Sequence, residues 1–373
     1  MRHSVAVERP LALYGAGNLG LLARAYCERV GIELHFVVDR AAASLSTSPQ
    51  WHGCVLQTPA QVAPAARREV CLAVSIVTEP FGDIERKLAS AGWNEVIPFY
   101  DIAESFRDRH PLSNGWFADP LDSGAAGQVA QALDRWDDDI SRAHHLQFLA
   151  WRRLREEWRF DHAPVRVEER FACPEVVAAL GDDESLLDIG AHTGSFVRLA
   201  LALLPSLRRL WAIEPDPYNM ARLHAWLFTL PDGLRQRVEL LPHLLASTSG
   251  VTRFHAGLDY ASQCTPLGSP WPCASVDDLE LHPTLIKLHV EGAELDLLRG
   301  ARRTLERQRP IVMATSYHND DGISRLPIWL HEQLPGYRLH FRMHGWCGTG
   351  AVIYAIPAER PALNCGDGLH ATR

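Results

Sequence analysis

Apolar and polar positions along the first part of the chain predict strands that are separated by helices. A short apolar run at residues 11–14 is followed by a glycine turn and by a helical pattern that reaches Val30. Another helical pattern covers residues 83–91. Because strands that alternate with helices form parallel, doubly wound sheets, we expect a first Rossmann-like domain over residues 1–105. Its strands are predicted at residues 11–14, 34–38, 70–77 and 95–99.

A helical pattern replaces the strand pattern in the middle of the chain. From Val129 to Phe148, apolar and aromatic residues recur at steps of three or four, which indicates one face of a helix. We therefore expect a helical connector over residues 106–165 that packs through this face.

A second alternation of strands and helices begins near Leu186. Two late apolar runs, at residues 337–343 and 351–356, are separated only by a turn, so they are expected to pair antiparallel. The pattern predicts a second doubly wound domain over residues 166–357 and a frayed tail over 358–373. The preceding strands of this domain are predicted at residues 186–189, 210–213, 238–241, 285–290 and 310–315.

The composition narrows the classes of partner. Hydrophobic residues make up 47% of the chain and charged residues 22%, as in ordinary globular proteins. The net charge of −8 argues against nucleic acid as the main partner, since phosphate binding requires a basic surface. No apolar run approaches the ~18 residues that cross a bilayer, and no secretion signal precedes Gly15. We therefore expect a cytoplasmic protein without membrane insertion.

The cysteines predict no metal site. The chain has eight of them, and none forms a C-x-x-C pair. This pattern indicates neither a zinc site nor a disulfide framework.

The first glycine turn has the spacing of a dinucleotide-binding motif. Gly15, Gly17 and Gly20 follow a predicted strand and open a helix, and Asp39 ends the next strand. Such glycines permit close approach of a pyrophosphate, and the carboxylate can bind ribose. Hydride-transfer chemistry is not supported, because neither of the two lysines has a tyrosine four positions before it. An NAD-dependent nucleotide-sugar oxidoreductase or epimerase is therefore the alternative function rather than the main one.

A second glycine turn carries the main hypothesis. Gly190 and Gly194 follow a strand that contains Asp188, and they let the backbone approach a ligand closely. Asp188 can order the turn or bind an amino group of the ligand. The next strand ends at Glu214, where a carboxylate can accept both hydroxyls of a ribose, and Asp216 can begin the following helix. These residues predict a nucleotide-type cofactor site.

A third strand, predicted at residues 285–290, ends in a glycine and acidic residues. Lys287 and His289 alternate with its aliphatic residues, so both side chains are expected on one side near the carboxyl end. Glu291 and Glu294 fall in the first turn of the next helix, where capping is one interpretation of their role. Because open α/β sheets bind ligands at this rim, Lys287 and Glu291 are candidate substrate-binding residues.

Six short motifs of the second domain form a linked set. They are DIGAHTG at 188–194, IEPDP at 213–217, SVDDL at 275–279, KLHVEGAE at 287–294, RP at 309–310 and SYH at 316–318. This set resembles the FkbM-type methyltransferases over residues 155–357. The resemblance implies a class I methyltransferase-like sheet with an antiparallel hairpin strand, S-adenosyl-L-methionine as the donor, and a hydroxyl of a sugar, glycan or natural product as the acceptor.

The resemblance also implies roles for individual residues. It assigns Asp188, Gly190, Gly194 and Glu214 to the cofactor site, to which we add Asp216. One departure concerns His289, which stands where the family motif Lys-Ile-Asp-x-Glu-Gly has aspartate. The role of this position, and any metal dependence, stay open.

Histidines are the candidate catalytic residues. A hydroxyl is a poor nucleophile, so a base that removes its proton accelerates the transfer, and histidine suits this task at neutral pH. His318 follows the strand at 310–315 and is the first candidate, and His289 at the same rim is its rival.

A third hypothesis is a non-catalytic protein that binds sugar nucleotides. The first domain resembles the small Rossmann-like module that precedes some of these methyltransferases and occurs in some sugar acyltransferases. That resemblance favours a binding or scaffolding role over a redox role. The pattern specifies no oligomeric state.

Overall fold

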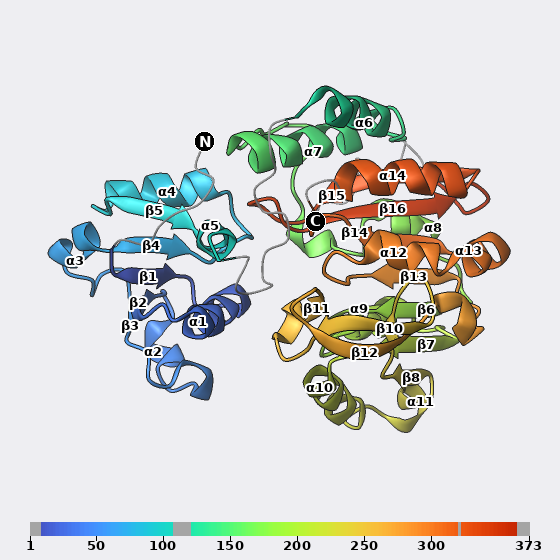
Figure 1. Ribbon diagram of the computed structural model, residues 1–373, viewed down its shortest axis with the longest axis horizontal. Helices are drawn as coiled ribbons and strands as arrows, with labels where there is room; N and C mark the ends of the chain where they lie inside the picture. The colour runs from blue at the N-terminus through green and yellow to red at the C-terminus, as the bar shows by residue number, and fades with distance from the viewer. Residues whose placement is uncertain (1–8, 107–120, 320–321, 364–373) are drawn as a thin grey trace, which may run out of the picture. The chain divides into compact units, whose positions relative to one another are not determined.

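The computed structural model describes residues 9–106, 121–319 and 322–363, and it confirms the expected mixed α/β class with parallel sheets (Figure 1). The chain divides into two units. Unit 1 comprises residues 1–120, 146–160 and 345–349. Unit 2 comprises residues 121–145, 161–344 and 350–373.

Unit 1 is built on a five-stranded sheet in which all neighbouring strands are parallel. The strand order is β3-β2-β1-β4-β5, so the chain leaves β1 in one direction and later returns to its other side, as in doubly wound folds. The strands are β1 (Leu11–Tyr14), β2 (Leu34–Val38), β3 (Leu56–Gln57), β4 (Cys71–Val74) and β5 (Glu95–Pro98). The helices are α1 (Asn18–Val30), α2 (Ala42–Leu45), α3 (Pro64–Glu69), α4 (Phe81–Ser90) and α5 (Phe99–Glu104).

Helix α4 illustrates why these segments adopt their structure. Its buried residues are Phe81, Ile84 and Leu88, at steps of three and four, so they form one apolar face. This face packs into the same core as Phe36 of β2 and Trp93. Burial of the face, rather than intrinsic propensity, stabilises a helix of this length.

Unit 2 contains a seven-stranded sheet with the order β15-β16-β14-β13-β6-β7-β8. β16 runs antiparallel to β14 and β15, and the other neighbouring pairs are parallel. β6, β13, β14 and β16 are buried along their whole length, as expected for strands covered on both faces. The strands are β6 (Ser185–Ile189), β7 (Arg209–Ile213), β8 (Val238–Leu241), β13 (Leu285–Leu288), β14 (Ile311–Thr315), β15 (Tyr337–Met343) and β16 (Ala351–Pro357).

The helices of unit 2 show recognisable start signals. Asp122 accepts a hydrogen bond from the Ala125 N–H at 2.7 Å and so caps α6. A proline occupies the first turn of both α8 and α10. The helices are α6 (Ser123–Leu133), α7 (Asp139–Leu149, which ends in unit 1), α8 (Pro174–Ala179), α9 (Ser195–Leu203), α10 (Pro217–Leu227), α11 (Asp232–Arg235), α12 (Glu294–Arg299), α13 (Arg302–Gln308) and α14 (Gly322–Gln333).

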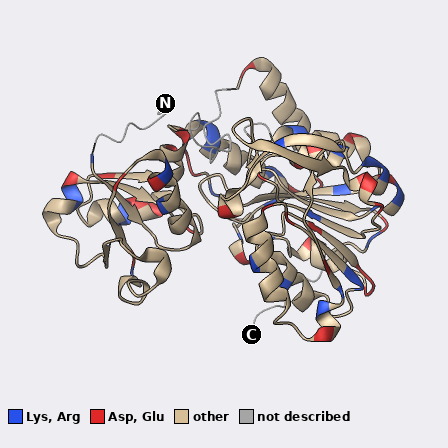
Figure 2. Cartoon of the chain, turned by 60° about the horizontal axis from the view of Figure 1, so that its bottom comes forward, with Lys and Arg blue, Asp and Glu red and all other residues tan. Residues whose placement is uncertain are grey.

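Neither the distribution of charged residues in unit 2 nor the hydropathy of the described helices indicates a surface of one charge or a membrane-spanning helix. Basic and acidic positions are interspersed over the helices and loops of unit 2 rather than separated into regions of one sign (Figure 2). Within the described ranges, the structure has no helix that is both long and apolar enough to cross a membrane.

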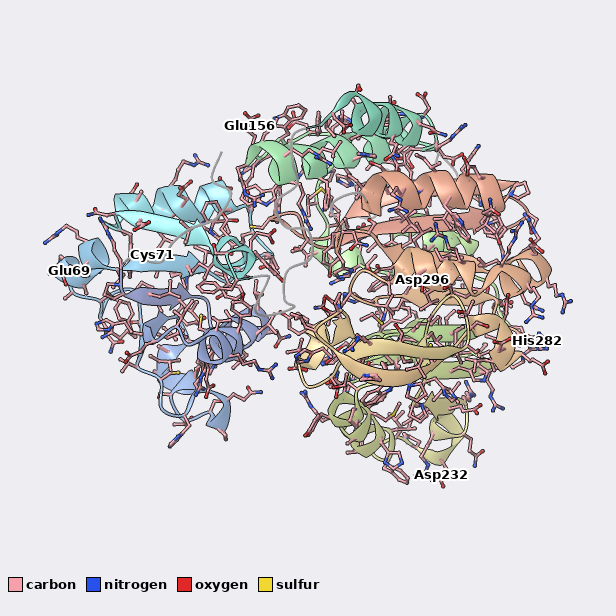
Figure 3. All side chains as sticks on the ribbon, viewed as in Figure 1. Glu69, Cys71, Glu156, Asp232, His282 and Asp296 are labelled. Carbon is pink, nitrogen blue, oxygen red and sulfur yellow. The ribbon has the colours of Figure 1, made fainter. Side chains whose placement is uncertain are left out.

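A four-stranded sheet that the sequence pattern did not predict lies between β8 and β13 in the chain, with the order β11-β10-β12-β9. Its strands carry few buried residues, and β12 contains two prolines, so the apolar alternation typical of a strand is missing. Asp296 of α12, labelled in Figure 3, accepts a hydrogen bond from the Ser247 N–H at 3.1 Å and ties this sheet to the helix. The strands are β9 (Leu244–Leu245), β10 (Gly250–His255), β11 (Gln263–Cys264) and β12 (Ser269–Ala274).

Several predicted boundaries differ from the structure. β13 ends at Leu288 instead of residue 290, because its pairing with both β6 and β14 stops there. β4 ends at Val74 instead of residue 77, where its pairing with β1 stops. β5 ends at Pro98, since Phe99 already begins α5.

The segments expected outside the two domains also differ. The helices of the expected connector at 106–165 are divided between the units, with α6 in unit 2, and residues 107–120 lie outside the described residues. Of the expected tail, residues 364–373 also lie outside them. Arg360 is ordered by an ion pair with Glu184, at 2.5 Å between Nη1 and Oε1.

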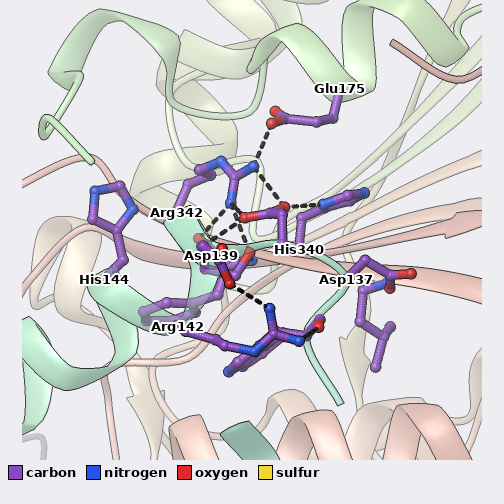
Figure 4. Close-up of polar contacts among 12 residues, drawn as sticks. Asp137, Asp139, Arg142, His144, Glu175, His340 and Arg342 are labelled. Atoms are coloured by element: carbon purple, nitrogen blue, oxygen red, sulfur yellow. Dashed lines mark hydrogen bonds and ion pairs between the residues drawn. The ribbon is translucent and has the colours of Figure 1, made fainter. Parts of the chain in front are cut away.

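Buried charges hold the start of α7 against β15 (Figure 4). The Arg342 guanidinium donates to Asp138 at 2.9 and 3.1 Å and also pairs with Glu175. His340, two residues earlier on β15, lies 2.5 Å from Asp138 through Nδ1. Burial opposes ionisation of Asp138, but the bonds from His340 and Arg342 hold its pKa well below the usual range. Arg342 is therefore the cation that stabilises two carboxylates in this part of unit 2.

Replacing Arg342 tests this network. Arg342→Met should lower the free energy of unfolding of unit 2 by about 2–3 kcal/mol, because two carboxylates lose their partner; the value lies below that of a fully buried pair because the Asp138 side chain is 27% exposed. Arg302→Met is the control, since Arg302 pairs with Glu306 on the surface and such pairs contribute roughly 0.5 kcal/mol or less. Urea denaturation measures both changes, and equal values for the two variants would contradict the assigned role of Arg342.

Candidate active site

The candidate residues of unit 2 gather at the carboxyl ends of β6, β7, β13 and β14. The chain passes from β6 to β7 on one side, whereas β13 lies on the other side of β6. The sheet therefore has its topological switch point between β6 and β13, and open α/β sheets bind ligands in the crevice outside this point.

The turn after β6 lies very close to the loop after β13. Gly190 has a φ of 76°, in the left-handed region, and a Cβ there would lie 2.0 Å from the His289 carbonyl oxygen. Gly194 has a φ of 86°, and a Cβ there would lie 2.6 Å from Leu223. Only glycine combines this backbone conformation with such approaches, so both predicted glycines are required by the geometry of the turn.

Lys287 and Asp188 form a buried ion pair beneath this turn. They are neighbours in the register of β13 and β6, so their side chains lie on the same face. Lys287 Nζ donates to Asp188 Oδ1 and to the Gly190 carbonyl oxygen, each at 2.8 Å. Complete burial raises the pKa of Asp188, and the lysine opposes this shift. Since Lys287 is 3% exposed and already bound to this pair of oxygens, the structure places it under the turn rather than with substrate-facing residues.

Glu214 lies beside the glycine turn at the end of β7. Its carboxylate accepts hydrogen bonds from the N–H groups of His192, at 2.8 Å, and Asp216, at 3.0 Å. Burial raises the pKa of Glu214, and these two N–H groups oppose the shift. The predicted neighbourhood of Glu214 and the glycine turn is therefore present in the structure.

Asp216 has its carboxylate directed elsewhere. One oxygen caps α10 by accepting from the Tyr218 N–H at 2.9 Å. The other accepts from the Gly257 N–H at 2.6 Å and the Ser262 hydroxyl at 2.5 Å. The expected helix-capping role is present, and the remaining oxygen anchors the segment of residues 257–262.

This same segment brings residues to the site that the sequence did not predict. Asp259 Oδ1 lies 2.5 Å from His192 Nε2 and accepts a bond from Arg222 at 3.1 Å. His192 stands in the glycine turn with a φ of 52°. Asp259 is 67 positions away from it in the chain, so no local pattern could indicate the contact.

His318 is enclosed by two carboxylates. Its Nδ1 lies 2.8 Å from Glu294 Oε1, and its Nε2 lies 3.3 Å from Glu291 Oε1. Glu294 also accepts a bond from the Thr315 hydroxyl at 2.6 Å. Burial opposes a charge on His318, but Glu291 and Glu294 raise its pKa well above the usual value. The two carboxylates favour the charged form of the ring, so the arrangement does not favour the predicted role of His318 as a base.

His289 occupies the more open position of the two histidines. Its side chain is 22% exposed, and its ring stacks on that of His318 with the centroids 5.3 Å apart. Nε2 lies 3.1 Å from the Tyr317 hydroxyl and 3.3 Å from Glu291 Oε1. Burial lowers the pKa of His289 to about 3, although Glu291 opposes the shift. The two histidines and Glu291 are therefore brought together, as expected.

Tyr317 and Arg170 complete this side of the site and were not predicted as site residues. The Arg170 guanidinium donates to the Tyr317 hydroxyl at 3.1 Å. The sequence did hold a signal for Tyr317, because this residue lies within the SYH motif at 316–318. The structure brings that motif next to the KLHVEGAE motif at 287–294. Arg170 precedes Tyr317 by 147 positions, and nothing in its own surroundings in the sequence indicates the contact.

A pocket of about 190 Å³ adjoins His318. Its lining includes Glu294, Ser316, Asn319 and Arg325.

The first glycine motif is explained largely by contacts within unit 1. A Cβ on Gly20 would lie 2.3 Å from the Gly15 carbonyl oxygen, so α1 must contain glycine to approach the turn. The Asp39 carboxylate accepts from the N–H groups of Ala16 and Ala41, each at 2.8 Å. Gly17 faces open space. Asp39 therefore orders its own turn, and a pocket of about 140 Å³ lies beside it.

These features define the class of protein. Unit 2 combines a parallel sheet, a glycine turn after β6, an acidic residue at the end of β7 and the antiparallel strand β16, which together are typical of Rossmann-like methyltransferases. Residues 188–339 match the family described as the methyltransferase FkbM domain. Residues 188–339 therefore form a domain of the FkbM methyltransferase family, which confirms the predicted family. The comparisons do not favour the NAD-dependent alternative.

One solved structure has the same fold over most of the chain. The chain is similar to the FkbM methyltransferase of Methylobacillus flagellatus KT, with 18% identity and a TM-score of 0.64, over 95% of this chain and 91% of that chain. A precorrin-6y C5,15-methyltransferase of Geobacter metallireducens GS-15 matches with 18% identity and a TM-score of 0.33, over 49% of this chain and 84% of that chain. An rRNA methylase of Streptococcus thermophilus matches with 13% identity and a TM-score of 0.31, over 51% and 92%. No curated protein matches the sequence significantly.

The close approach at Gly190 gives a direct test of the site geometry. Gly190→Ala should lower the free energy of unfolding of unit 2 by at least about 2 kcal/mol, because a side chain adds left-handed strain and a backbone clash. Gly233→Ala is the matched control, since no atom lies within 4 Å of a Cβ at that position. Urea denaturation should leave the control close to wild type, and a Gly190→Ala variant as stable as wild type would refute the described contact with His289.

Proposed function

We propose that the protein is an S-adenosyl-L-methionine-dependent O-methyltransferase that acts on a hydroxyl of a sugar, a glycan or a natural product. The observation that carries this proposal is the juxtaposition of two sets of residues across the switch point of unit 2. Gly190 and Glu214 form the donor side, and His289 and His318 form the acceptor side. The contact between Gly190 and the His289 backbone keeps the two sides adjacent.

The donor side has groups that fit a nucleoside-type cofactor. Each oxygen of the Glu214 carboxylate already accepts an N–H bond, but an ionised carboxylate has about four acceptor positions and can also accept ribose hydroxyls. The left-handed glycines let the turn pass close to the His289 carbonyl and to Leu223, which keeps its backbone at the end of β6 beside Glu214. When bound, S-adenosyl-L-methionine supplies a methyl group on a positively charged sulfur that a hydroxyl oxygen can attack. Asp188 and Lys287 would support the turn from below.

On the acceptor side, we assign His289 as the residue that faces the hydroxyl. Its Nε2 lies at the partly exposed edge of the site, whereas the His318 ring is 2% exposed and held by Glu294. His318 is then a positioning residue that supports His289 through the stacked rings. Glu291 lies 3.3 Å from the Nε2 atom of each imidazole, and we assign it to the acceptor side as well.

Removal of the Glu214 carboxylate should weaken donor binding. We expect Glu214→Ala to reduce the affinity for S-adenosyl-L-methionine by about 1–3 kcal/mol, because charge-assisted hydrogen bonds are lost. Glu214→Gln keeps the side-chain volume and should give a smaller loss. Glu239→Ala, at a half-exposed position of β8, is the control. Isothermal titration calorimetry measures all four proteins, and equal affinity in wild type and Glu214→Ala would exclude the proposed donor site.

Replacement of His289 should affect turnover but not donor binding. We expect His289→Ala to lower kcat by about 10²–10⁴-fold, the usual loss when a group that promotes removal of the hydroxyl proton is deleted. His282→Ala is the control, because this exposed histidine, labelled in Figure 3, precedes β13 at the opposite end of the strand.

The assay uses labelled donor and a panel of sugar and natural-product hydroxyl acceptors. If His289→Ala keeps wild-type turnover while His318→Ala loses it, His318 rather than His289 faces the acceptor. If neither variant loses turnover, orientation of the reactants alone carries the transfer.

A further inference from the structure

Three potential ligand atoms converge at the carboxyl ends of β13 and β14. Glu291 Oε1 lies 3.3 Å from His289 Nε2 and 3.3 Å from His318 Nε2, and all three atoms lie within 4.8 Å of one another. β13 and β14 are parallel neighbours, so the loops that carry these residues end at the same edge of the sheet. The cluster therefore depends on the fold of unit 2 and not on a chance contact at its surface.

The spacing of these atoms fits a transition-metal ion. Ligands bound to a metal at ~2.0–2.2 Å are separated from one another by roughly 3.0–3.5 Å in tetrahedral or octahedral sites. Both distances from Glu291 Oε1 fall in this range. Two imidazoles and one carboxylate on one side of an ion also leave other coordination positions open, as in catalytic metal sites.

His318 provides an independent indication of a ligand. Its Nε2 is buried and forms no hydrogen bond with the described residues, because the contact with Glu291 is close but not aligned for one. Its other ring nitrogen is held by Glu294, which is held in turn by Thr315. A carboxylate on the far nitrogen of an imidazole is the usual support of metal-binding histidines, since it fixes the orientation of the ring.

A second cluster of potential metal ligands in unit 2 provides a comparison, because its carboxylates already have a cationic partner. Asp138, Glu175 and His340 also bring three ligand atoms together. There the Arg342 guanidinium lies among them and bonds to both carboxylates, so the position of a cation is already taken. At the first cluster, the nearby guanidinium of Arg170 instead bonds to the Tyr317 hydroxyl.

We propose that His289, Glu291 and His318 bind one divalent first-row transition-metal ion, such as Mn²⁺, Fe²⁺, Co²⁺ or Zn²⁺. Imidazole ligands favour these ions over Mg²⁺ and Ca²⁺, which prefer oxygen. The ion replaces the hydrogen bond between His289 and Tyr317. No metal site was predicted from the sequence, because only the spacing of cysteines was considered. The ligands proposed here are instead two histidines and a glutamate, and His289 is one of them.

Binding of the ion does not require methyl transfer, but its role rests on the proposed function. When bound, the ion would leave coordination positions open to an acceptor hydroxyl and would lower the pKa of that hydroxyl, so that its proton would pass more readily to solvent. His289 and His318 then act as ligands that hold the ion beside the donor side.

Co²⁺ is the probe for this site, since its visible absorption reports on its ligands. The full-length protein is first treated with a chelator, dialysed and titrated with Co²⁺ without donor or acceptor. We expect saturation at one ion per chain. His289→Ala and Glu291→Gln should each weaken binding by at least about ten-fold, as losses around metal sites do. His282→Ala should bind like wild type.

The outcomes separate this inference from the proposed function. Absence of saturable Co²⁺ binding in wild type, unchanged affinity in both site variants, or an equal loss in His282→Ala would overturn the metal site. His289 is the more exposed ligand, so its variant remains informative if Glu291→Gln does not fold, as judged by circular dichroism. Donor binding is measured separately by calorimetry. Binding of Co²⁺ without binding of S-adenosyl-L-methionine would support the metal site and contradict the proposed function. Binding of S-adenosyl-L-methionine without Co²⁺ would contradict the metal site and leave the proposed function supported.

Discussion

The close approach of two loops at the switch point of unit 2 is the constraint on which the site depends. The Gly190 turn and the His289 backbone lie so near each other that a Cβ on Gly190 would be 2.0 Å from a carbonyl oxygen. The Lys287 ammonium holds this arrangement from below, because it bonds to Asp188 of β6 and to the Gly190 carbonyl. A lysine on one strand thereby fixes a turn that follows the neighbouring strand. The residues of the proposed donor and acceptor sides are adjacent because the backbone, rather than flexible side chains, sets their separation.

Buried charge is handled in two ways in unit 2. Near β15, the guanidinium of Arg342 bonds directly to Asp138 and Glu175, so the pair of carboxylates has a permanent partner. Near β13 and β14, Glu291 and Glu294 share the imidazole of His318. Isolated buried charges are costly, and each needs a partner or a metal ion. The first cluster thus contains its own cation, whereas the second has only an imidazole between its carboxylates.

The sequence predicted those parts of the molecule that depend on local patterns. The apolar runs around Leu186, Leu210 and Leu285 indicated the buried strands, and the left-handed turn required the glycines at 190 and 194. The sheet of β9 to β12 was missed because its strands are short and carry few buried residues. Contacts between residues far apart in the chain, such as Arg170 with Tyr317, cannot be predicted from a local sequence pattern. Lys287 was predicted to bind substrate because alternation along a strand tells which face of the sheet a side chain lies on, but not which residue it contacts. The contact with Asp188 follows from the register between β13 and β6, which the sequence pattern does not give.

The departure at position 289 changes the charge of the site in a definite direction. The family motif has aspartate there, and an aspartate would bring a third carboxylate next to Glu291 and Glu294. Like charges at such distances raise the pKa of one of the groups and favour its neutral form. The imidazole of His289 avoids this repulsion and offers nitrogen in place of oxygen, 3.3 Å from Glu291. A histidine at this position therefore makes the site less acidic than an aspartate would, and in the proposed metal site it would favour ions that prefer nitrogen ligands, while the backbone of residue 289 keeps its contact with Gly190.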